Sequence, residues 1–192
     1  MNLILIMVIG YAFGNICNAY LIGKIFLKKD VREYGSGNAG ATNAIRAFGA
    51  KVGVLVFILD VTKGMVAVAL GRYLEPTIGP YVAGFMAIIG HNWPIALKFK
   101  GGKGIATSIG VMLVINPVVS LISFAIGFSI AFFTRIVSLG SLVGVAIAPI
   151  VVIFMRPIDI RLLVFTVMLS SLAVFRHRGN ITRLIKGQEN KL

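Results

Sequence analysis

Seven hydrophobic stretches constrain this chain more than any other feature of its sequence. They cover approximately residues 3–23, 52–71, 77–93, 104–115, 117–133, 138–155 and 160–176. Of the 192 residues, 58% are hydrophobic and only 13% are charged, whereas a soluble domain carries about 25% charged residues. A stretch of about 20 apolar residues can cross a bilayer as a helix. The sequence therefore predicts an all-α polytopic membrane protein.

The fourth stretch, 104–115, is shorter than the about 20 residues that a crossing helix needs. Asn116-Pro117 separates it from the fifth stretch, and proline cannot continue the hydrogen bonding of a helix. We expect two spans joined by a turn at Asn116-Pro117. The alternative is one kinked span, which would reverse the orientation of everything that follows.

The distribution of charge orients the predicted spans. The chain has 19 lysines and arginines against 6 aspartates and glutamates, a formal net charge of +13. Cytoplasmic loops of membrane proteins are enriched in such basic residues. With seven spans, one side receives only Arg72, Arg156 and Arg161, Lys63 lies within a span, and the other basic residues gather on the opposite side. The sequence predicts seven transmembrane helices with the N-terminus outside and the C-terminus in the cytoplasm.

The segment 34–46, YGSGNAGATNAIR, combines glycines with short polar side chains and one arginine. Glycine lets the backbone approach a ligand, and backbone N–H groups beside an arginine suit phosphate oxygens. The segment lacks the spacing of a nucleotide P-loop and the βαβ context of a dinucleotide site. An ordinary loop between spans is the alternative. We interpret it as an anion site with candidate residues Ser36, Gly37, Asn38, Gly40, Thr42, Asn43 and Arg46.

A second basic segment, HNWPIALKFKGGKG at 91–104, lies on the same predicted side. It ends at Gly104, where the fourth helix is expected to start, and a glycine entry with a lysine attracts anions to a helix N-terminus. Its lysines also fit the simpler role of positive charge at the membrane interface. For Gly102 and Lys103 we favour contact with a ligand, whereas for His91 both interpretations stay open.

The C-terminal segment places two polar residues directly after the last span. His177 and Asn180 stand three residues apart around Gly179. A polybasic cytoplasmic tail binds lipid head groups, but this does not explain a histidine and an asparagine, which add no fixed charge. We expect His177 and Asn180 to complete a polar site, with His177 as a proton acceptor or a phosphate ligand.

Two charged residues fall inside the second predicted span. Asp60 and Lys63 are three residues apart, so they share a helix face and can pair. Ionisable groups within a membrane are costly and face a polar interior. A structural ion pair is the interpretation we favour over direct chemistry.

Taken together, three segments resemble the bacterial acyl-phosphate-dependent glycerol-3-phosphate acyltransferases, a family of small integral membrane proteins. They read GSGNAGATNAIR at 35–46, GHNWPIALKFKGGKGIAT at 90–107 and HRGNITRLIKGQE at 177–189. Asp60-x-x-Lys63-Gly64 adds to the likeness. With the span count, the resemblance covers essentially the whole chain, residues 1–192, as a single membrane-embedded catalytic domain.

The resemblance implies a reaction at the cytoplasmic side of the bacterial inner membrane. An acyl group would pass from a fatty acyl-phosphate to the 1-hydroxyl of glycerol 3-phosphate, giving lysophosphatidic acid and inorganic phosphate, the first step of phospholipid biosynthesis. The family uses no cofactor and no metal in this step. The expected partners are the two substrates and membrane lipids, with no nucleic acid, while the oligomeric state and the acyl-chain preference stay open.

We assign roles on this basis as hypotheses. Ser36, Lys103 and His177 are the candidate catalytic residues. Substrate binding is assigned to Gly37, Asn38, Gly40, Thr42, Asn43, Arg46, His91, Gly102 and Asn180. The proton acceptor is either His177 or an oxygen of the acyl-phosphate, and Ser36 has no visible activating base for a covalent step.

Two rivals come from other classes of protein. A transporter of a small anionic phosphorylated metabolite would also explain the basic loops and the intramembrane pair, but no inverted repeat is visible and the polar groups gather on one face. A phosphatidyl-group transferase would need clustered metal-binding carboxylates, and the six acidic residues are scattered.

Overall fold

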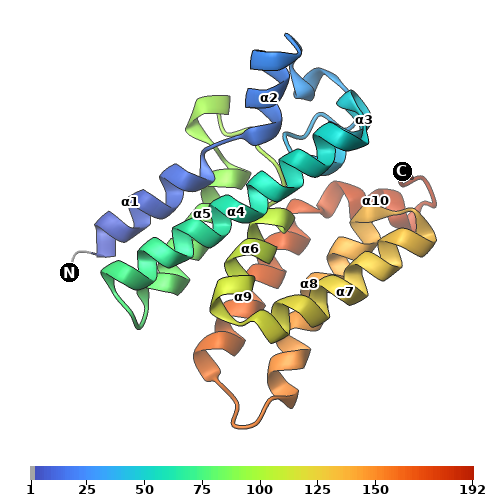
Figure 1. Ribbon diagram of the computed structural model, residues 1–192. Coiled ribbons are helices and arrows are strands. Elements are labelled where there is room, and N and C mark those ends of the chain that lie inside the picture. Colours follow the sequence, from blue (N-terminus) through green and yellow to red (C-terminus); the bar gives the residue numbers. More distant parts are fainter. Residues whose placement is uncertain (1–2) are drawn as a thin grey trace. The chain divides into compact units, whose positions relative to one another are not determined.

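The computed structural model describes residues 3–192, which form helices and short 3-10 turns and contain no strand. The chain divides into two compact units, Met1–Ile115 and Asn116–Leu192. Figure 1 traces both along the sequence. Each unit is described by itself.

The first unit is built around one long helix. Its elements are α1 (Leu3–Gly14), α2 (Asn18–Phe26), η1 (Val31–Glu33), α3 (Ala41–Phe48), α4 (Ala50–Leu74), α5 (Gly79–Asn92), η2 (Ile95–Leu97) and α6 (Ile105–Ile115). Helix α4 packs against α1, α3, α5 and α6, and α1 also packs against α5. The side chains of α4 are therefore the ones best placed to contact several other elements.

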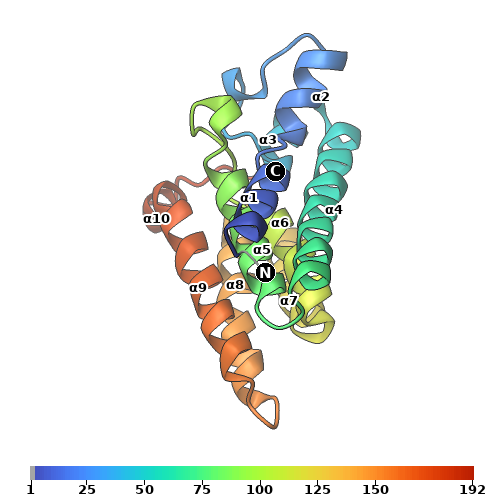
Figure 2. The same cartoon turned by 90° about the vertical axis from the view of Figure 1, so that its left-hand side faces the viewer.

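The two ends of this unit differ in character. Figures 1 and 2 both show α2, α3 and the connection between α5 and α6 at one end, with the connection between α4 and α5 at the other. The α4–α5 connection is short, and the Glu75 carboxylate accepts hydrogen bonds from the backbone N–H groups of Thr77, Ile78 and Gly79. The long polar loops of this unit thus gather at a single end.

Glycines let the helices of the first unit approach at backbone distance. A Cβ atom at Gly14 would overlap the carbonyl of Ala87 on α5, and one at Gly110 of α6 would overlap the carbonyl of Val61 on α4. Close contact through small residues is how membrane helices gain van der Waals packing without a hydrophobic driving force between them. These glycines hold α1 on α5 and α6 on α4.

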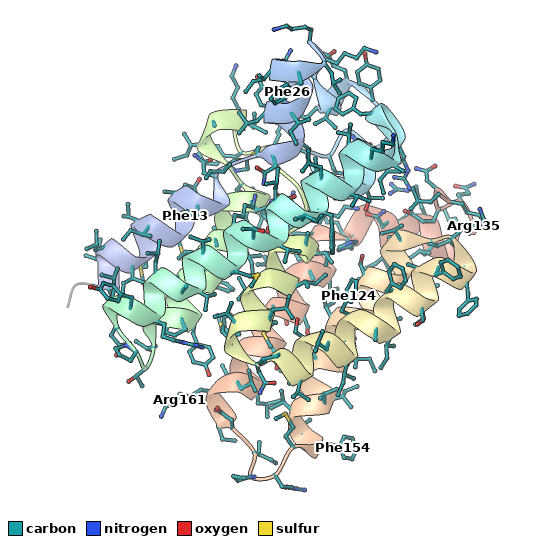
Figure 3. The ribbon with its side chains drawn as sticks, viewed as in Figure 1. Phe13, Phe26, Phe124, Arg135, Phe154 and Arg161 are labelled. Carbon is teal, nitrogen blue, oxygen red and sulfur yellow. The ribbon has the colours of Figure 1, made fainter. Side chains whose placement is uncertain are left out.

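The second unit contains α7 (Pro117–Thr134), α8 (Val137–Phe154), α9 (Ile160–Arg176) and α10 (Arg178–Ile185). Helix α8 packs against α7 and α9. Figure 3 shows Arg135 at one end of this unit and Phe154 with Arg161 at the other. The backbone N–H of Leu192 donates to the carbonyl of Arg135 at 2.9 Å, so the end of the chain lies beside the α7–α8 connection.

Most predicted stretches match single helices, including the start at Pro117, where the Asn116 side chain accepts from the N–H of Val119 at 3.0 Å. By length and composition, three helices can cross a membrane, or up to five if each of two bent pairs forms one span. Helices α5 and α6, at 14 and 11 residues, are shorter. The seven crossings, the hairpin at Asn116-Pro117 and the orientation therefore stay predictions.

Our expectation of one helix over residues 3–23 was wrong. Helix α1 ends at Gly14, α2 begins at Asn18, and the two are bent by 43°. The break exposes the carbonyls of Gly14 and Ile16, which accept hydrogen bonds from the Lys63 ammonium at 3.2 and 2.7 Å. Because a distant lysine satisfies the broken backbone, hydropathy alone does not reveal the break.

The segment after the last stretch also differs from a simple tail. It turns by 65° at His177 and forms the short helix α10. Helix α10 (Arg178–Ile185) was not predicted from the sequence.

Candidate active site

The glycine-rich segment is folded around the side chain of Asn43, on α3. Its amide oxygen accepts from the Ser36 backbone N–H at 2.7 Å and from the Ser36 hydroxyl at 3.2 Å. Its amide nitrogen donates to the carbonyls of Val31 and Tyr34 at 2.8 and 2.9 Å. Asn43 is buried and ties the loop to the helix that follows it, so it determines the shape of the loop.

Gly35 and Gly37 give the loop a conformation that other residues rarely adopt. Their φ angles are +57° and +72°, in the region where only glycine carries no steric penalty. A Cβ atom at Gly35 would also overlap the Asn43 side-chain oxygen and lie 3.4 Å from Cβ of Arg46. The Arg46 side chain therefore lies against the loop.

The polar groups of the loop cluster at its exposed tip. The Asn38 side chain donates to the Ser36 hydroxyl at 3.1 Å and to the Ser36 carbonyl at 3.3 Å. Gly40 then leads into α3, whose first turn, which includes Thr42, has no side-chain cap. An uncapped helix N-terminus presents backbone N–H groups and the positive end of the helix dipole. Both the free N–H groups and the helix dipole favour the binding of an anion at this end of α3.

Arg32 links this loop to the second basic segment. Its guanidinium donates to the Asp30 carboxylate at 2.8 Å and to the carbonyl of Leu97, in η2, at 3.5 Å, and it lies over the ring of Tyr20. The side-chain hydrogen bond with Arg32 lowers the pKa of Asp30 and raises that of Arg32. The two basic loops of the first unit are therefore neighbours.

The second loop folds back onto His91, at the end of α5. The N–H of Gly102 donates to the carbonyl of His91 at 3.1 Å, and a Cβ atom at Gly102 would overlap Nε2 of the His91 ring. Gly104 follows with φ of +80° and leads into α6. Lys103 lies between this contact and the helix N-terminus, half-buried. Lys103 therefore follows directly after the residue that contacts the His91 imidazole.

His91 also contacts the buried ion pair of α4. The predicted Asp60–Lys63 pair is confirmed, with 3.0 Å between Nζ and Oδ1 and side chains only 1% and 4% exposed. Lys63 Nζ lies 2.8 Å from Nδ1 of His91, and Asn18 Nδ2 donates to Asp60 at 2.9 Å. His91 is 3% exposed, so it does not serve as an interface anchor.

The predicted residues of the C-terminal segment form a separate cluster in the second unit. The ring nitrogen Nδ1 of His177 lies 2.8 Å from the carbonyl of Ala173. Since a carbonyl only accepts, Nδ1 carries a proton and Nε2 is the nitrogen that can accept one. Asn180 Nδ2 donates to the Glu189 carboxylate at 2.6 Å. Both predicted residues are buried.

Glu189 is the centre of this cluster and was not predicted from the sequence. Its carboxylate also accepts from Arg183 Nε at 2.8 Å and from the Ser138 hydroxyl at 3.0 Å. Burial raises the pKa of Glu189, but the hydrogen bonds from Asn180, Arg183 and Ser138 bring it below its ordinary value. In the sequence, Glu189 is distinguished as the one acidic residue among the basic residues of 177–192.

The structure thus groups the candidate residues in two places. The candidate residues of the glycine-rich loop, with His91, Gly102 and Lys103, belong to the neighbouring loops of the first unit, whereas His177 and Asn180 lie in the second unit. Within residues 3–192, no group of three or more histidine, cysteine or acidic side chains is placed to hold a metal ion.

Comparisons with known proteins give a consistent result. A sequence model of the family described as Glycerol-3-phosphate acyltransferase matches residues 4–187. Among curated proteins, a glycerol-3-phosphate acyltransferase of Thermoanaerobacter pseudethanolicus is 48% identical over 100% of this chain and 96% of its own length. One from Clostridioides difficile is 40% identical over 98% of this chain and 95% of its own length.

Two solved structures share the fold. Both are crystal structures of PlsY, described as an integral membrane glycerol 3-phosphate acyltransferase, one in its glycerol 3-phosphate form and one in its lysophosphatidic acid form. They superpose with TM-scores of 0.91 and 0.89 at 35% and 34% identity, and each match covers 100% of this chain and 96% of that one.

Proposed function

The chain belongs to the glycerol-3-phosphate acyltransferase family, and we propose that its acyl donor is a fatty acyl-phosphate. The 1-hydroxyl oxygen of glycerol 3-phosphate attacks the acyl carbon, a new ester C–O bond forms, and the bond to the phosphate oxygen breaks. The products are lysophosphatidic acid and inorganic phosphate, and the hydroxyl proton passes to a base. The site lies at the cytoplasmic face of the bacterial inner membrane.

The pairing of two glycine-rich loops with two basic residues supports this proposal. Two neighbouring glycine-rich loops at the same end of the first unit each lead into a helix, and each is accompanied by a cation, Arg46 for α3 and Lys103 for α6. Helix N-termini with a basic residue bind phosphate. A reaction between two phosphorylated substrates needs two such sites.

We assign the glycine-rich loop to the acyl-phosphate. Ser36, Gly37, Asn38, Gly40 and Thr42 surround its phosphate, and Asn43 fixes the shape of the loop through four hydrogen bonds, two of them from the N–H and the hydroxyl of Ser36. Ser36 acts as a donor and not as a nucleophile, because its hydroxyl faces the amide oxygen of Asn43, which is too weak a base to activate it.

We assign glycerol 3-phosphate to Arg46, Lys103, Gly102 and His91 of the first unit, and the assignment of His177 and Asn180 to the same substrate stays a prediction from the sequence. Arg46 and Lys103 neutralise its phosphate, and donors near the acyl carbonyl stabilise the developing oxyanion. The proton acceptor is His177 Nε2 or a phosphate oxygen of the donor, since the tautomer fixed by Ala173 leaves Nε2 as the basic nitrogen of this ring.

Donor identity is tested with the purified protein in detergent or nanodiscs. With glycerol 3-phosphate and a palmitoyl-phosphate donor, we expect equal amounts of lysophosphatidic acid and inorganic phosphate, and no product from palmitoyl-CoA or acyl carrier protein. Product from acyl-CoA alone would refute the acyl-phosphate assignment. Uptake of glycerol 3-phosphate into proteoliposomes without turnover would favour the transporter instead.

The role of His177 is tested by a pair of substitutions. His177→Ala removes the ring, whereas His177→Asn keeps a donor near the Ala173 carbonyl but has no nitrogen in the place of Nε2. If His177 is the base, both lower kcat by about 10²–10⁴-fold with little change in KM. A rise in KM alone would assign His177 to binding and the base to the substrate phosphate.

A further inference from the structure

The Asp60–Lys63 pair lies at the break of the first helix pair and not in the middle of an uninterrupted apolar surface. Lys63 Nζ donates to the carbonyls of Gly14 and Ile16, at the end of α1. Asp60 accepts from the side chain of Asn18, the first residue of α2. The cation therefore lies at the C-terminal end of one helix and the anion at the N-terminal end of the next, as the helix dipoles favour.

The protonation of the cluster follows from its acceptors. Lys63 Nζ is surrounded by two carbonyl oxygens, a carboxylate oxygen and Nδ1 of His91, all within 3.2 Å. A lysine ammonium is a donor only, so a proton on Nδ1 would place two donors facing each other at 2.8 Å. Nδ1 of His91 must then provide a lone pair to Lys63, so the proton of the neutral imidazole lies on Nε2.

That proton lies at the second loop. Nε2 is the ring atom closest to where a Cβ at Gly102 would stand, and Lys103 is the next residue. The cluster thus connects four elements, which are the facing ends of α1 and α2, the charged face of α4, and the loop that leads into α6. His91 is the member that touches both the ion pair and the loop.

We infer that Asp60 and Lys63 are positioning residues of the active site. They join the broken ends of α1 and α2 and hold His91 in the tautomer whose Nε2–H faces the Gly101–Gly104 loop. The inference rests on the proposed function only in giving this loop a substrate phosphate to bind. Lys63 itself lies behind the imidazole and acts through it.

The tautomer is measurable without substrate. The chain contains only two histidines, so protein labelled with ¹⁵N in histidine gives two pairs of ring-nitrogen signals, and a His177→Asn variant assigns the pairs. We expect His91 to be protonated at Nε2 alone and His177 at Nδ1 alone. A His91 protonated at Nδ1, or present as a mixture of both tautomers, would overturn the inference. This experiment requires no variant of the buried pair.

A substitution then tests the role of Lys63 itself. In Lys63→Met the Asp60 carboxylate, 3.8 Å from Nδ1 of His91, becomes the nearest partner of that nitrogen, and we expect Nδ1 to gain a proton. Lys51→Met is the matched control, because Lys51 is exposed in the first turn of the same helix, and it should leave both signals unchanged. An unchanged His91 signal in folded Lys63→Met would refute the role of Lys63.

Activity provides a second measurement. Misplacement of a binding group by about 1 Å lowers rates by about 10²-fold, and we expect Lys63→Met to lower kcat/KM for glycerol 3-phosphate to that extent, largely through KM. If Lys63→Met does not fold, the Asp60→Asn/Lys63→Met double variant leaves no unpaired charge and takes its place. Wild-type protein that fails to use acyl-phosphate would refute the proposed donor while leaving the predicted tautomer intact.

Discussion

Asp60 and Glu189 have similar partners and are both buried, with side chains 1% and 4% exposed, but their basic partners differ in exposure. Each carboxylate accepts from an asparagine side chain, Asn18 at 2.9 Å or Asn180 at 2.6 Å, and each pairs with a basic residue. The side chain of Lys63 is 4% exposed, whereas that of Arg183 is 39% exposed. The same set of groups therefore fixes a buried helix junction in one unit and fastens a chain terminus in the other.

The comparison indicates that burial of the basic partner determines how much such an ion pair contributes to the free energy of unfolding. Removing one partner of a buried pair leaves an uncompensated charge, whereas a solvated pair contributes about 0–1 kcal/mol. The four predictions that follow test this difference.

The largest expected effect is that of Lys63→Met on stability. The substitution leaves the Asp60 carboxylate buried without its cation and two carbonyls at the helix break without a donor, and we expect a loss of about 3–5 kcal/mol. Thermal unfolding in detergent measures it, with Lys51→Met as the exposed control. A loss equal to that of Lys51→Met would show that the junction does not depend on the pair.

The next effect concerns the asparagine partners. Asn18→Ala removes a hydrogen bond to a buried carboxylate, which is worth about 1.5–3 kcal/mol. Asn180→Ala removes the corresponding bond to Glu189, where Arg183 and Ser138 also donate, and should cost less. Denaturation of the two variants side by side gives the difference. Equal losses would mean that burial does not separate the two clusters.

Glu189→Gln should have a smaller effect. The amide keeps the shape of the side chain but removes the charge that pairs with the half-exposed Arg183, and we expect a loss of at most about 1 kcal/mol. The change should be local, with faster amide hydrogen exchange in residues 186–192 and unchanged exchange in α4. Global unfolding of this variant would contradict a fastening role confined to the tail.

Acid should produce the smallest change, and again only in the tail. The folded pKa of Glu189 lies below its ordinary value of 4.5, so its contribution to stability is present above pH 4.5 and is lost as the pH falls through the folded pKa. Limited proteolysis of residues 186–192 between pH 6 and 3 should accelerate below about pH 4.5. Glu189→Gln should remove the pH dependence, and a dependence that persists would assign it to another group.

Sequence patterns predicted the features that depend on nearby residues. The start of α7 at Pro117 follows from the stereochemistry of proline, and the pairing of Asp60 with Lys63 follows from their spacing of three on a helix. Gly104 before α6 was likewise expected as a helix entry. Such features need no knowledge of which elements meet in space.

The features that were missed depend on contacts between distant residues. The break after Gly14 is satisfied by Lys63, which lies 49 residues later, and Glu189 is held partly by Ser138, 51 residues earlier. Residues 15–17 at the break include neither a proline nor a charged residue, so the hydrophobic pattern predicts one helix there. The position of His91 between Lys63 and Gly102 likewise follows from the packing of α5 beside α4.

The glycine contacts between helices also limit where an acyl chain could lie in the first unit. Because Gly14 lies directly on the backbone of Ala87, and Gly110 on that of Val61, no methylene chain fits through the seams between α1 and α5 or between α4 and α6. For the proposed acyl-phosphate donor, we therefore expect the fatty tail to lie outside these two seams while the phosphate reaches the loops. A preference for acyl chains of a certain length would therefore depend on other interfaces between helices.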